Sequence, residues 1–392
     1  MEERILPKFK EVLSHIIKND DVAYIKESFD YVSMIQKKFV RDGLAPSSPF
    51  SYLWSQNRAN QSKNRYTNIF PYDYNRVVLD HHSKSKPPKN IFASVEEAKN
   101  SILELSNNLK SEYLDSAYDD GYINASWIQA PLNISNNEYI ATQGPTNKTS
   151  GDFWNMVYEN RCPVIVMLTK TVESGYEKCS EYWPTNIHIP KDYGKVTVTL
   201  ISETDAVNES TKLREFIVSS NHKVAANNII KQGICKVTQY HFLGWPDKFI
   251  PHSTKNLQEL ITHTRNSKLS AFSSQLSIDQ FSSLDNANCT SIMHNNKDSQ
   301  YHLETFLNSE TIFLPSVGPT VVHCSAGCGR TGTFIILDII CEYFKNNKDY
   351  SGDIIYDLFF AFRLQRVYFI QTLDQLLFVY SFVYKHLNKP SQ

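Results

Sequence analysis

One stretch near the C-terminal end constrains the fold more than any other. Residues 320–333 read TVVHCSAGCGRTGT, and the apolar run at 334–344 follows directly. The β-branched start predicts a buried strand, and the apolar run predicts a buried helix. Glycines between them allow backbone N–H groups to converge on one point. Because a helix N-terminus with unpaired amides favours negative charge, this stretch predicts an anion-binding loop.

Two side chains of this loop predict catalysis rather than binding alone. Cys324 would lie at the mouth of the loop, where the amides and the helix end stabilise a thiolate. Arg330 can reach back and bind two oxygens of a phosphate with its planar guanidinium. A nucleophile and a bidentate anion clamp together make a phosphoryl-transfer site. Thr331 would place a hydroxyl near the sulfur, where it could help the thiolate to leave.

Three other interpretations of the same stretch fit its residues less well. Its glycines fit the dinucleotide-binding pattern GxGxxG, but that pattern is weak alone and no second strand–helix–strand unit follows. His323, Cys324 and Cys328 could ligate a metal, but no second pair follows at zinc spacing. A simple glycine-rich turn with a buried cysteine would leave Arg330 unexplained.

Composition restricts the class of protein. The 392 residues suffice for one large domain or two ordinary ones, and 41% hydrophobic with 21% charged residues is typical of a soluble globular protein. Forty basic against 41 acidic residues give no field that would attract nucleic acid or a membrane surface. Seven cysteines without framework spacing, and no secretory or membrane-spanning segment, predict a cytoplasmic chain with access to the nucleus.

The motif HCx5RTG at 323–332 resembles the signature of the classical, non-receptor type protein tyrosine phosphatases. The resemblance spans roughly residues 57–387. It implies an α/β fold, with a twisted mixed β-sheet flanked by helices and a phosphate-binding loop between a strand and a helix N-terminus. Further blocks carry the resemblance: KNRYTNIFPYD at 63–73, GYINAS at 121–126, YIATQGP at 139–145, HFLGWPD at 241–247 and RLQRVYFIQTLDQ at 363–375.

The resemblance assigns the chemistry of the first step. Cys324 would attack phosphorus, and Arg330 would hold the phosphate together with the amides of the loop. Asp247, which follows Trp245 on a mobile loop, would protonate the leaving phenol. Family members usually carry glycine where this chain has Phe249, which puts the motion of that loop in doubt. The loop residues implied to contact substrate are Ser325, Ala326, Gly327, Cys328 and Gly329.

Other blocks imply the walls of the pocket. Tyr66 would stack on the phenol ring and make the pocket deep enough to exclude phosphoserine. Asn68 would face the substrate backbone, at a position where the family often has aspartate. Glu173 would orient Arg330, and Lys178 would lie near the rim. His323 and Trp245 are the remaining supporting residues of the phosphate loop and the acid loop.

The last block implies the second step. Gln371 would position the water that hydrolyses the phosphocysteine, with Gln375 assisting. Tyr368 stands where family members often have glycine. A bulky side chain there should narrow access beside the pocket and disfavour doubly phosphorylated substrates.

Together these residues predict hydrolysis of phosphotyrosine in proteins by a two-step cysteinyl-phosphate mechanism, with no metal and no cofactor. Partners would be phosphotyrosine-containing proteins, signalling kinases among them as for some fungal members, and the chain would be a monomer. Two alternatives stay open. An inactive phosphotyrosine-binding module typically loses the cysteine, the acid or the arginine, and this chain keeps all three. A dual-specificity phosphatase needs a shallower pocket than Tyr66 implies.

The rest of the chain suggests its organisation. Helical apolar stripes at 2–18 and 21–40 predict a helical extension, residues 1–50, packed on a catalytic domain at 51–390. A helix is expected at 253–265. The segment 267–308, rich in Ser, Asn and Asp, is expected to be a largely flexible insertion.

Overall fold

The computed structural model places most of the chain. It describes residues 8–18, 21–45, 48–79, 121–131, 134–226, 229–247, 249–281, 311–313, 318–346 and 349–388.

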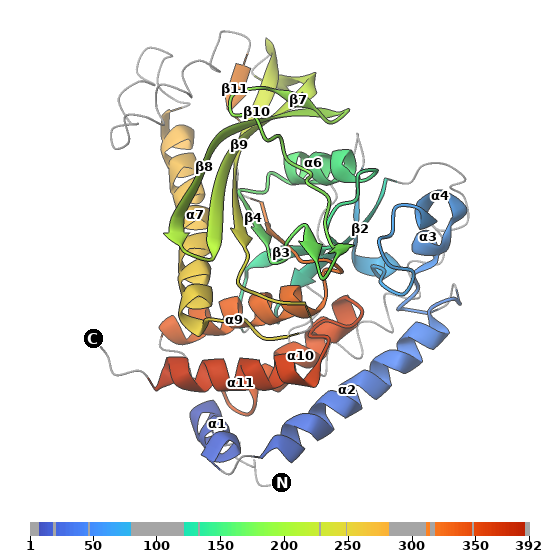
Figure 1. Ribbon diagram of the computed structural model, residues 1–392, viewed down its shortest axis with the longest axis vertical. Helices are drawn as coiled ribbons and strands as arrows, with labels where there is room; N and C mark the ends of the chain where they lie inside the picture. Colours follow the sequence, from blue (N-terminus) through green and yellow to red (C-terminus); the bar gives the residue numbers. More distant parts are fainter. Residues whose placement is uncertain are drawn as a thin grey trace.

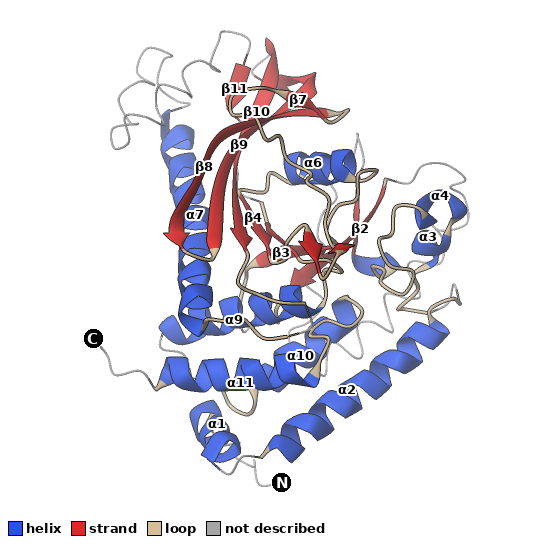
Figure 2. Ribbon diagram, in the orientation of Figure 1, coloured by secondary structure: helices blue, strands red, loops and turns tan. Residues whose placement is uncertain are grey.

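A ten-stranded twisted sheet forms the centre of the molecule (Figure 2). The strands follow the order β1-β2-β3-β12-β4-β10-β9-β8-β7, and β11 pairs with β10. β3, β12, β4 and β10 run parallel, as do β10 and β11, and the other neighbouring strands of the sheet pair antiparallel. A separate hairpin pairs β5 with β6. The strands are β1 (Arg76–Val78), β2 (Tyr122–Gln129), β3 (Glu138–Thr142), β4 (Val164–Met167), β5 (Val172–Glu173), β6 (Tyr176–Glu177), β7 (Lys191–Asp192), β8 (Val196–Asn208), β9 (Thr211–Ala226), β10 (Ile229–Phe242), β11 (Thr311–Phe313) and β12 (Thr320–His323).

Helices cover both faces of this sheet, so the predicted α/β class with a mixed sheet is confirmed (Figure 1). α6 lies on one face, and α7, α9, α10 and α11 lie on the other. No helix within the described ranges is long and apolar enough to cross a membrane. The helices are α1 (Phe9–Lys18), α2 (Val22–Asp42), α3 (Leu53–Gln56), α4 (Arg58–Gln61), the 3-10 helix η1 (Asp73–Asn75), α6 (Ser150–Glu159), α7 (Thr254–Phe281), α9 (Gly329–Lys345), α10 (Ile354–Gln365) and α11 (Leu373–Leu387).

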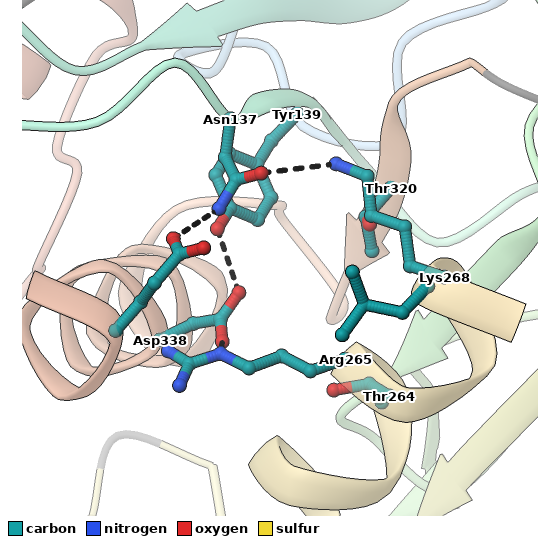
Figure 3. Close-up of a pocket in the computed structure, with 9 residues that line it drawn as sticks. Asn137, Tyr139, Thr264, Arg265, Lys268, Thr320 and Asp338 are labelled. Carbon is teal, nitrogen blue, oxygen red and sulfur yellow. Dashed lines mark hydrogen bonds and ion pairs between the residues drawn. The ribbon is translucent and has the colours of Figure 1, made fainter. Parts of the chain in front are cut away.

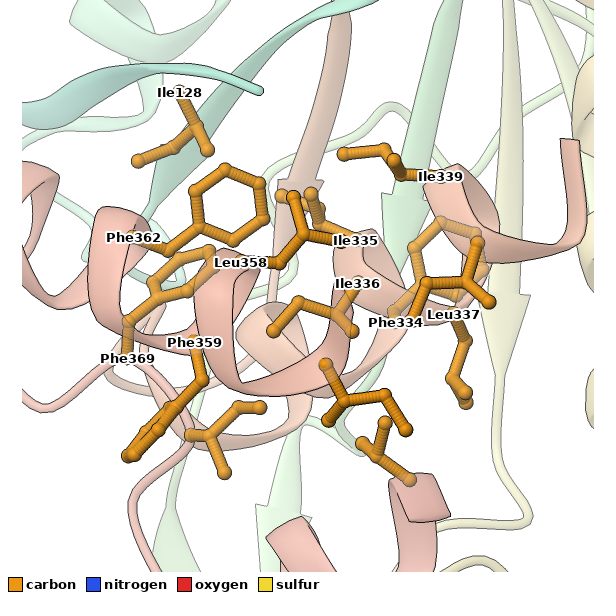
Figure 4. Close-up of a cluster of buried hydrophobic side chains, with 14 of the residues drawn as sticks. Ile128, Phe334, Ile335, Ile336, Leu337, Ile339, Leu358, Phe359, Phe362 and Phe369 are labelled. Carbon is orange, nitrogen blue, oxygen red and sulfur yellow. The ribbon is translucent and has the colours of Figure 1, made fainter. Parts of the chain in front are cut away.

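β12 lies between two hydrophobic cores, one on each face of the sheet. Val321 points into the core under α6, and Val322 points into the core that contains α9, as expected for alternating strand residues. α9 is buried along most of its length, and Figure 4 shows Phe334, Ile335 and Ile336 packed among side chains of neighbouring elements. This burial fixes the N-terminus of α9 directly beyond the end of β12.

The N-terminal helices pack against the last helices of the chain. Phe9 on α1 stacks on Phe344 of α9 with ring centroids 5.5 Å apart. Gln36 on α2 donates a 2.6 Å hydrogen bond to the carbonyl of Arg363 on α10. Residues 1–7, the start of the helix expected at 2–18, lie outside the described residues.

The helix expected at 253–265 is longer than predicted, since α7 continues to Phe281. The expectation of a flexible insertion from residue 267 was therefore wrong for its first part, and residues 282–308 lie outside the described ranges. Tertiary contacts explain the extension. Ser267 hydrogen-bonds the hydroxyl of Tyr240 at 2.6 Å, and the Lys268 ammonium lies 5.8 Å from the Tyr139 ring. Such contacts override the weak helix propensity of serine and asparagine.

Candidate active site

The loop between β12 and α9 adopts a conformation that requires glycine. Gly327 has φ +71°, and a Cβ atom there would lie 2.1 Å from the carbonyl oxygen of Thr142. Its backbone N–H points back into the loop and donates to the Cys324 sulfur at 3.3 Å. The loop thus directs a backbone donor at the predicted nucleophile, as an anion site requires.

Cys324 is buried, and its surroundings favour the thiolate. Burial alone would raise its pKa, but the Arg330 guanidinium and hydrogen bonds from Thr331 and from the Cys328 amide together hold the pKa below the ordinary value. The buried Thr331 hydroxyl has no hydrogen-bond partner at bonding distance among the described residues, so it acts on the sulfur as a nearby donor. A thiolate at this position is therefore a stronger nucleophile at neutral pH than an ordinary cysteine.

Cys328 behaves differently, although it belongs to the same loop. Burial raises the pKa of its thiol to about 12, and the thiol donates weakly to the carbonyl of Ala326 at 3.5 Å. Its side chain is therefore a neutral packing group, and only its backbone amide serves the sulfur of Cys324.

Arg330 is held in place by a bidentate ion pair. Its two terminal nitrogens lie 2.7 and 3.2 Å from the two carboxylate oxygens of Glu173. One nitrogen also donates to the carbonyl of Trp245 at 2.9 Å, and the other lies 3.1 Å from Asp247. The guanidinium is buried, which strengthens these contacts. Arg330 thereby joins the phosphate loop, the β5–β6 hairpin and the acid loop.

Asp247 lies between two cations. Its second oxygen is 2.9 Å from the Lys178 ammonium, and this contact raises the pKa of Lys178. The Trp245 indole donates to the carbonyl of Phe249 at 2.9 Å, which closes a short turn around the aspartate. The Phe249 side chain is 67% exposed, so the residue contributes its backbone to this turn and presents its ring to solvent.

Tyr66 reaches the phosphate loop directly. Its hydroxyl lies 2.7 Å from the Ser325 hydroxyl, which also donates to the carbonyl of Lys178 at 2.8 Å. The ring is half-buried against the core, which suits a wall of a pocket. Asn68 is exposed, and its contact with a substrate backbone stays a prediction.

The two glutamines lie against the start of α9. A Cβ atom on Gly329 would come 2.8 Å from the Gln375 side chain and 3.1 Å from Cβ of Gln371. Gln375 is buried and accepts the Gln371 backbone N–H at 2.9 Å, while Gln371 is exposed. The arrangement leaves the Gln371 side chain at the surface beside the phosphate loop.

Two arginines that support the site were missed by sequence reasoning. Arg366 is buried and donates to the carbonyls of Gly327 and Ala326 at 2.7 and 3.1 Å. Arg65 donates to the carbonyls of Gly144 and Pro145 at 2.9 and 2.8 Å and so fixes the loop that carries Tyr66. For Arg366 the available signal was a charged residue at the end of an almost entirely apolar helix, because such residues stay buried only when they are paired.

Known proteins resemble this chain over most of its length. The family model described as protein-tyrosine phosphatase matches residues 60–385. Mouse receptor-type tyrosine-protein phosphatase eta is 31% identical over 322 residues, which cover 82% of this chain and 18% of the relative. Zebrafish receptor-type tyrosine-protein phosphatase F is 30% identical over 340 residues, which cover 86% of this chain and 13% of the relative. The chain thus spans less than a fifth of these relatives.

Solved structures show the same fold. A structure of PTPN18 superposes with a TM-score of 0.64 and 22% identity, covering 96% of this chain and all of the other. PTPN18 in complex with HER2 phosphopeptides gives a TM-score of 0.61 and 23% identity, covering 93% of this chain and 99% of the other.

Proposed function

Because this chain belongs to the protein-tyrosine phosphatase family, we propose that it hydrolyses phosphotyrosine in proteins through a cysteinyl-phosphate intermediate. One arrangement carries the proposal above all others. The Arg330 guanidinium is paired with Glu173, contacts Asp247 and lowers the pKa of Cys324. An anion clamp that contacts a carboxyl group and stabilises a thiolate brings together the three components that cleavage of a phosphate ester requires.

In the first step, the Cys324 sulfur attacks phosphorus while the bond between phosphorus and the tyrosine oxygen breaks. Arg330 and the loop amides stabilise the charge on the equatorial oxygens. A bound phosphate dianion would compete with Asp247 for Arg330, since both are anions on the same guanidinium. The displaced Asp247, once it has taken up a proton from solvent, would then donate that proton to the departing phenol oxygen, whose pKa near 10 makes it a poor leaving group without one.

In the second step, water attacks the phosphocysteine. Gln371 orients the water, Asp247 takes its proton, and the bond between phosphorus and sulfur breaks to release inorganic phosphate. The thiolate leaves with the support of Thr331 and of the loop amides that lower its pKa. Gln375 assists by accepting a hydrogen bond from the Gln371 backbone N–H.

Substrate binding follows from the pocket walls. We propose that the Tyr66 ring stacks on the phenol, that Asn68 faces the substrate backbone and that Lys178 lies at the rim. The substrates are then phosphotyrosine-containing proteins, as PTPN18 has been solved with phosphopeptides. Signalling kinases are the finer proposal within this class, and signal transduction is the process it would serve.

We propose residues 51–390 as the catalytic domain and residues 1–50 as a helical extension packed on it. The packing of α1 and α2 on α9, α10 and α11 supports this division. We also propose a monomer in the cytoplasm with access to the nucleus. The six described cysteines are all free thiols, which is usual in a reducing compartment.

The direct test compares a phosphotyrosine peptide with its phosphoserine twin, in buffer that contains a metal chelator. Cleavage of the tyrosine peptide alone, abolished by Cys324→Ser, would support the proposal. Asp247→Ala should bind the peptide and release phosphate very slowly. Tight binding without turnover by the native chain would instead indicate a binding module, and cleavage of both peptides would indicate dual specificity.

A further inference from the structure

A chain of buried hydrogen bonds joins Arg214 on β9 to the backbone of Cys324. Arg214 Nη1 donates to Gln239 Oε1 at 2.9 Å, and Gln239 Nε2 donates to the Tyr182 hydroxyl at 2.7 Å. That hydroxyl lies 2.8 Å from His323 Nε2, and His323 Nδ1 lies 3.1 Å from the Cys324 carbonyl oxygen. Every one of these side chains is at most 5% exposed. The path therefore runs through the interior without a break.

A second branch leaves the same nitrogen of Arg214 and ends at the phosphate clamp. Arg214 Nη1 lies 3.2 Å from His241 Nδ1, and His241 Nε2 lies 2.8 Å from the carbonyl oxygen of Thr169. The Thr169 hydroxyl donates to Glu173 at 3.0 Å, on the oxygen that pairs with Arg330. One guanidinium is thus connected to the backbone of the nucleophile and to the carboxylate that orients the clamp.

The direction of each bond follows from which atoms can donate. A carbonyl oxygen only accepts, so His323 carries its proton on Nδ1 and His241 carries its proton on Nε2. Burial lowers the pKa of His323 to about 3 and that of His241 to about 4, so both rings are neutral and the other nitrogen of each accepts. Arg214 only donates. It therefore stands at the donor end of both branches.

We propose that Arg214 is a positioning residue that, from the donor side and together with the two carbonyl acceptors, fixes the tautomers of two buried histidines and thereby the backbone at Cys324 and the Glu173–Arg330 pair. The proposal rests on the phosphatase activity proposed above. It extends that proposal by identifying a residue, remote from the substrate, that sets the geometry of the Cys324 backbone and of the Glu173–Arg330 pair.

Arg214 is itself held at three points. Its Nε pairs with Glu203, the guanidinium lies 4.4 Å from the Trp183 ring centre, and Gln239 accepts from Nη1. A methionine of similar length would keep much of the packing and remove every donor. Lysine would keep the charge and some donors but not the planar shape that serves Glu203, Gln239 and His241 together.

The control is another ion-paired arginine, partly buried with 19% of its side chain exposed, that belongs to neither branch. Arg265 on α7 pairs with Asp338 on α9, and Tyr139 also donates to Asp338 at 2.6 Å. Figure 3 shows this ion pair lining a separate cavity of about 60 Å³. Arg265→Met should therefore cost at least as much stability as Arg214→Met, because it leaves the buried Asp338 carboxylate without its cation, whereas the Glu203 carboxylate is 35% exposed and also pairs with Lys212.

The experiment measures histidine tautomers by ¹⁵N NMR in the full chain, and kcat and KM on a phosphotyrosine peptide. In the native chain, His323 should show Nδ1–H and His241 Nε2–H. Arg214→Met should disturb the His241 state and lower kcat by about tenfold to a hundredfold, the range typical when a supporting hydrogen-bond partner is removed. KM should change less. Arg214→Lys should recover part of kcat, and Arg265→Met should leave both tautomers and kcat in place.

Two results would overturn the proposal. One is an unchanged His241 tautomer in Arg214→Met. The other is an equal loss of kcat in Arg265→Met at matched thermal stability, which would mean that lost stability alone explains the effect. Should Arg214→Met fail to fold, the same comparison is made with Arg214→Lys. Failure of the native chain to cleave the peptide would instead refute the proposed function, and the tautomers would still decide the role of Arg214.

Discussion

Glu173 and Arg330 lie 157 residues apart in the chain and meet in a two-point ion pair, with N–O distances of 2.7 and 3.2 Å. The pair is largely buried, with side chains 10% and 2% exposed. Two parallel contacts fix the plane of the guanidinium, which a single contact would leave free to rotate. The orientation of the phosphate clamp is therefore set by the β5–β6 hairpin and not by α9 alone.

Glu173→Gln should lower kcat/KM by about tenfold to a hundredfold, because small misplacement of a catalytic group has costs of this size. The glutamine keeps the volume but loses the charge and one of the two acceptors. The matched control is Glu181→Gln, an exposed glutamate further along the same segment. Steady-state kinetics on a phosphotyrosine peptide measure the effect. Equal activity of the two variants would show that Arg330 is oriented by its other contacts.

Thr331→Ala should raise the pKa of Cys324, since the Thr331 hydroxyl favours the thiolate. The rate of inactivation by iodoacetate, followed between about pH 5 and pH 9, reports the thiolate fraction. Its midpoint should move to higher pH in the variant. Thr333→Ala is the control, because Thr333 is buried in the same helix and bonds the carbonyl of Gly329 instead. An unchanged midpoint in Thr331→Ala would show that the Thr331 hydroxyl does not lower the pKa of Cys324.

Sequence reasoning was most successful where the chemistry is local. Cys324 and Arg330 belong to one short loop, so the strand, glycines and helix around them define their geometry. The contacts of Arg330 with Glu173 and Asp247 could be expected only from the family resemblance. Nothing in the intervening chain indicates that these residues, far apart in the sequence, lie close together in the fold. Arg366 and Arg214 escaped notice since each acts through backbone or interior partners that only the fold brings together.

The same contrast holds for the fold: elements with a local sequence pattern were predicted, and an extension held by tertiary contacts was not. The apolar patterns predicted the buried strand that begins at residue 320 and the buried helix at 334–344, which correspond to β12 and α9. The extension of α7 to Phe281 could not be predicted, because the segment has a loop-like composition. The contacts of Ser267 and Lys268 with distant tyrosines hold it, and these exist only in the folded chain.

The free energy of unfolding should fall as the pH is lowered from 6.5. Burial lowers the pKa of His323 to about 3 and of His241 to about 4, from 6.5 in an exposed histidine. Below pH 6.5 the unfolded chain therefore binds protons that the folded chain does not. Each histidine should contribute about 1 kcal/mol between pH 6.5 and pH 5.5, where the unfolded imidazole goes from half to mostly protonated, and the slope approaches about 1.4 kcal/mol per pH unit below that. Denaturant titrations at about pH 6.5 and pH 5.5 measure the slope, and His241→Gln should remove one histidine's share. An unchanged slope in that variant would contradict the assignment.

Tyr368 should make the enzyme discriminate against doubly phosphorylated substrates. It has φ +54°, a backbone conformation that favours glycine, and its N–H donates to Gln36 at 2.9 Å. We expect a singly phosphorylated peptide to be hydrolysed faster than its tandem-phosphorylated counterpart. Tyr368→Gly should narrow the difference while leaving the backbone unstrained. A preference of the native chain for the tandem peptide would contradict this role.

The central claim is that phosphate passes through the sulfur of Cys324. Rapid acid quenching of the native chain with a phosphotyrosine peptide, followed by peptide mapping, tests it most directly. We expect phosphate on the peptide that contains Cys324 within the first turnover. More of it should accumulate in Gln371→Ala, where the attacking water is poorly placed, and none should form in Cys324→Ser. Turnover of the peptide with no phosphate ever found on Cys324 would contradict the account, because water would then attack the substrate directly.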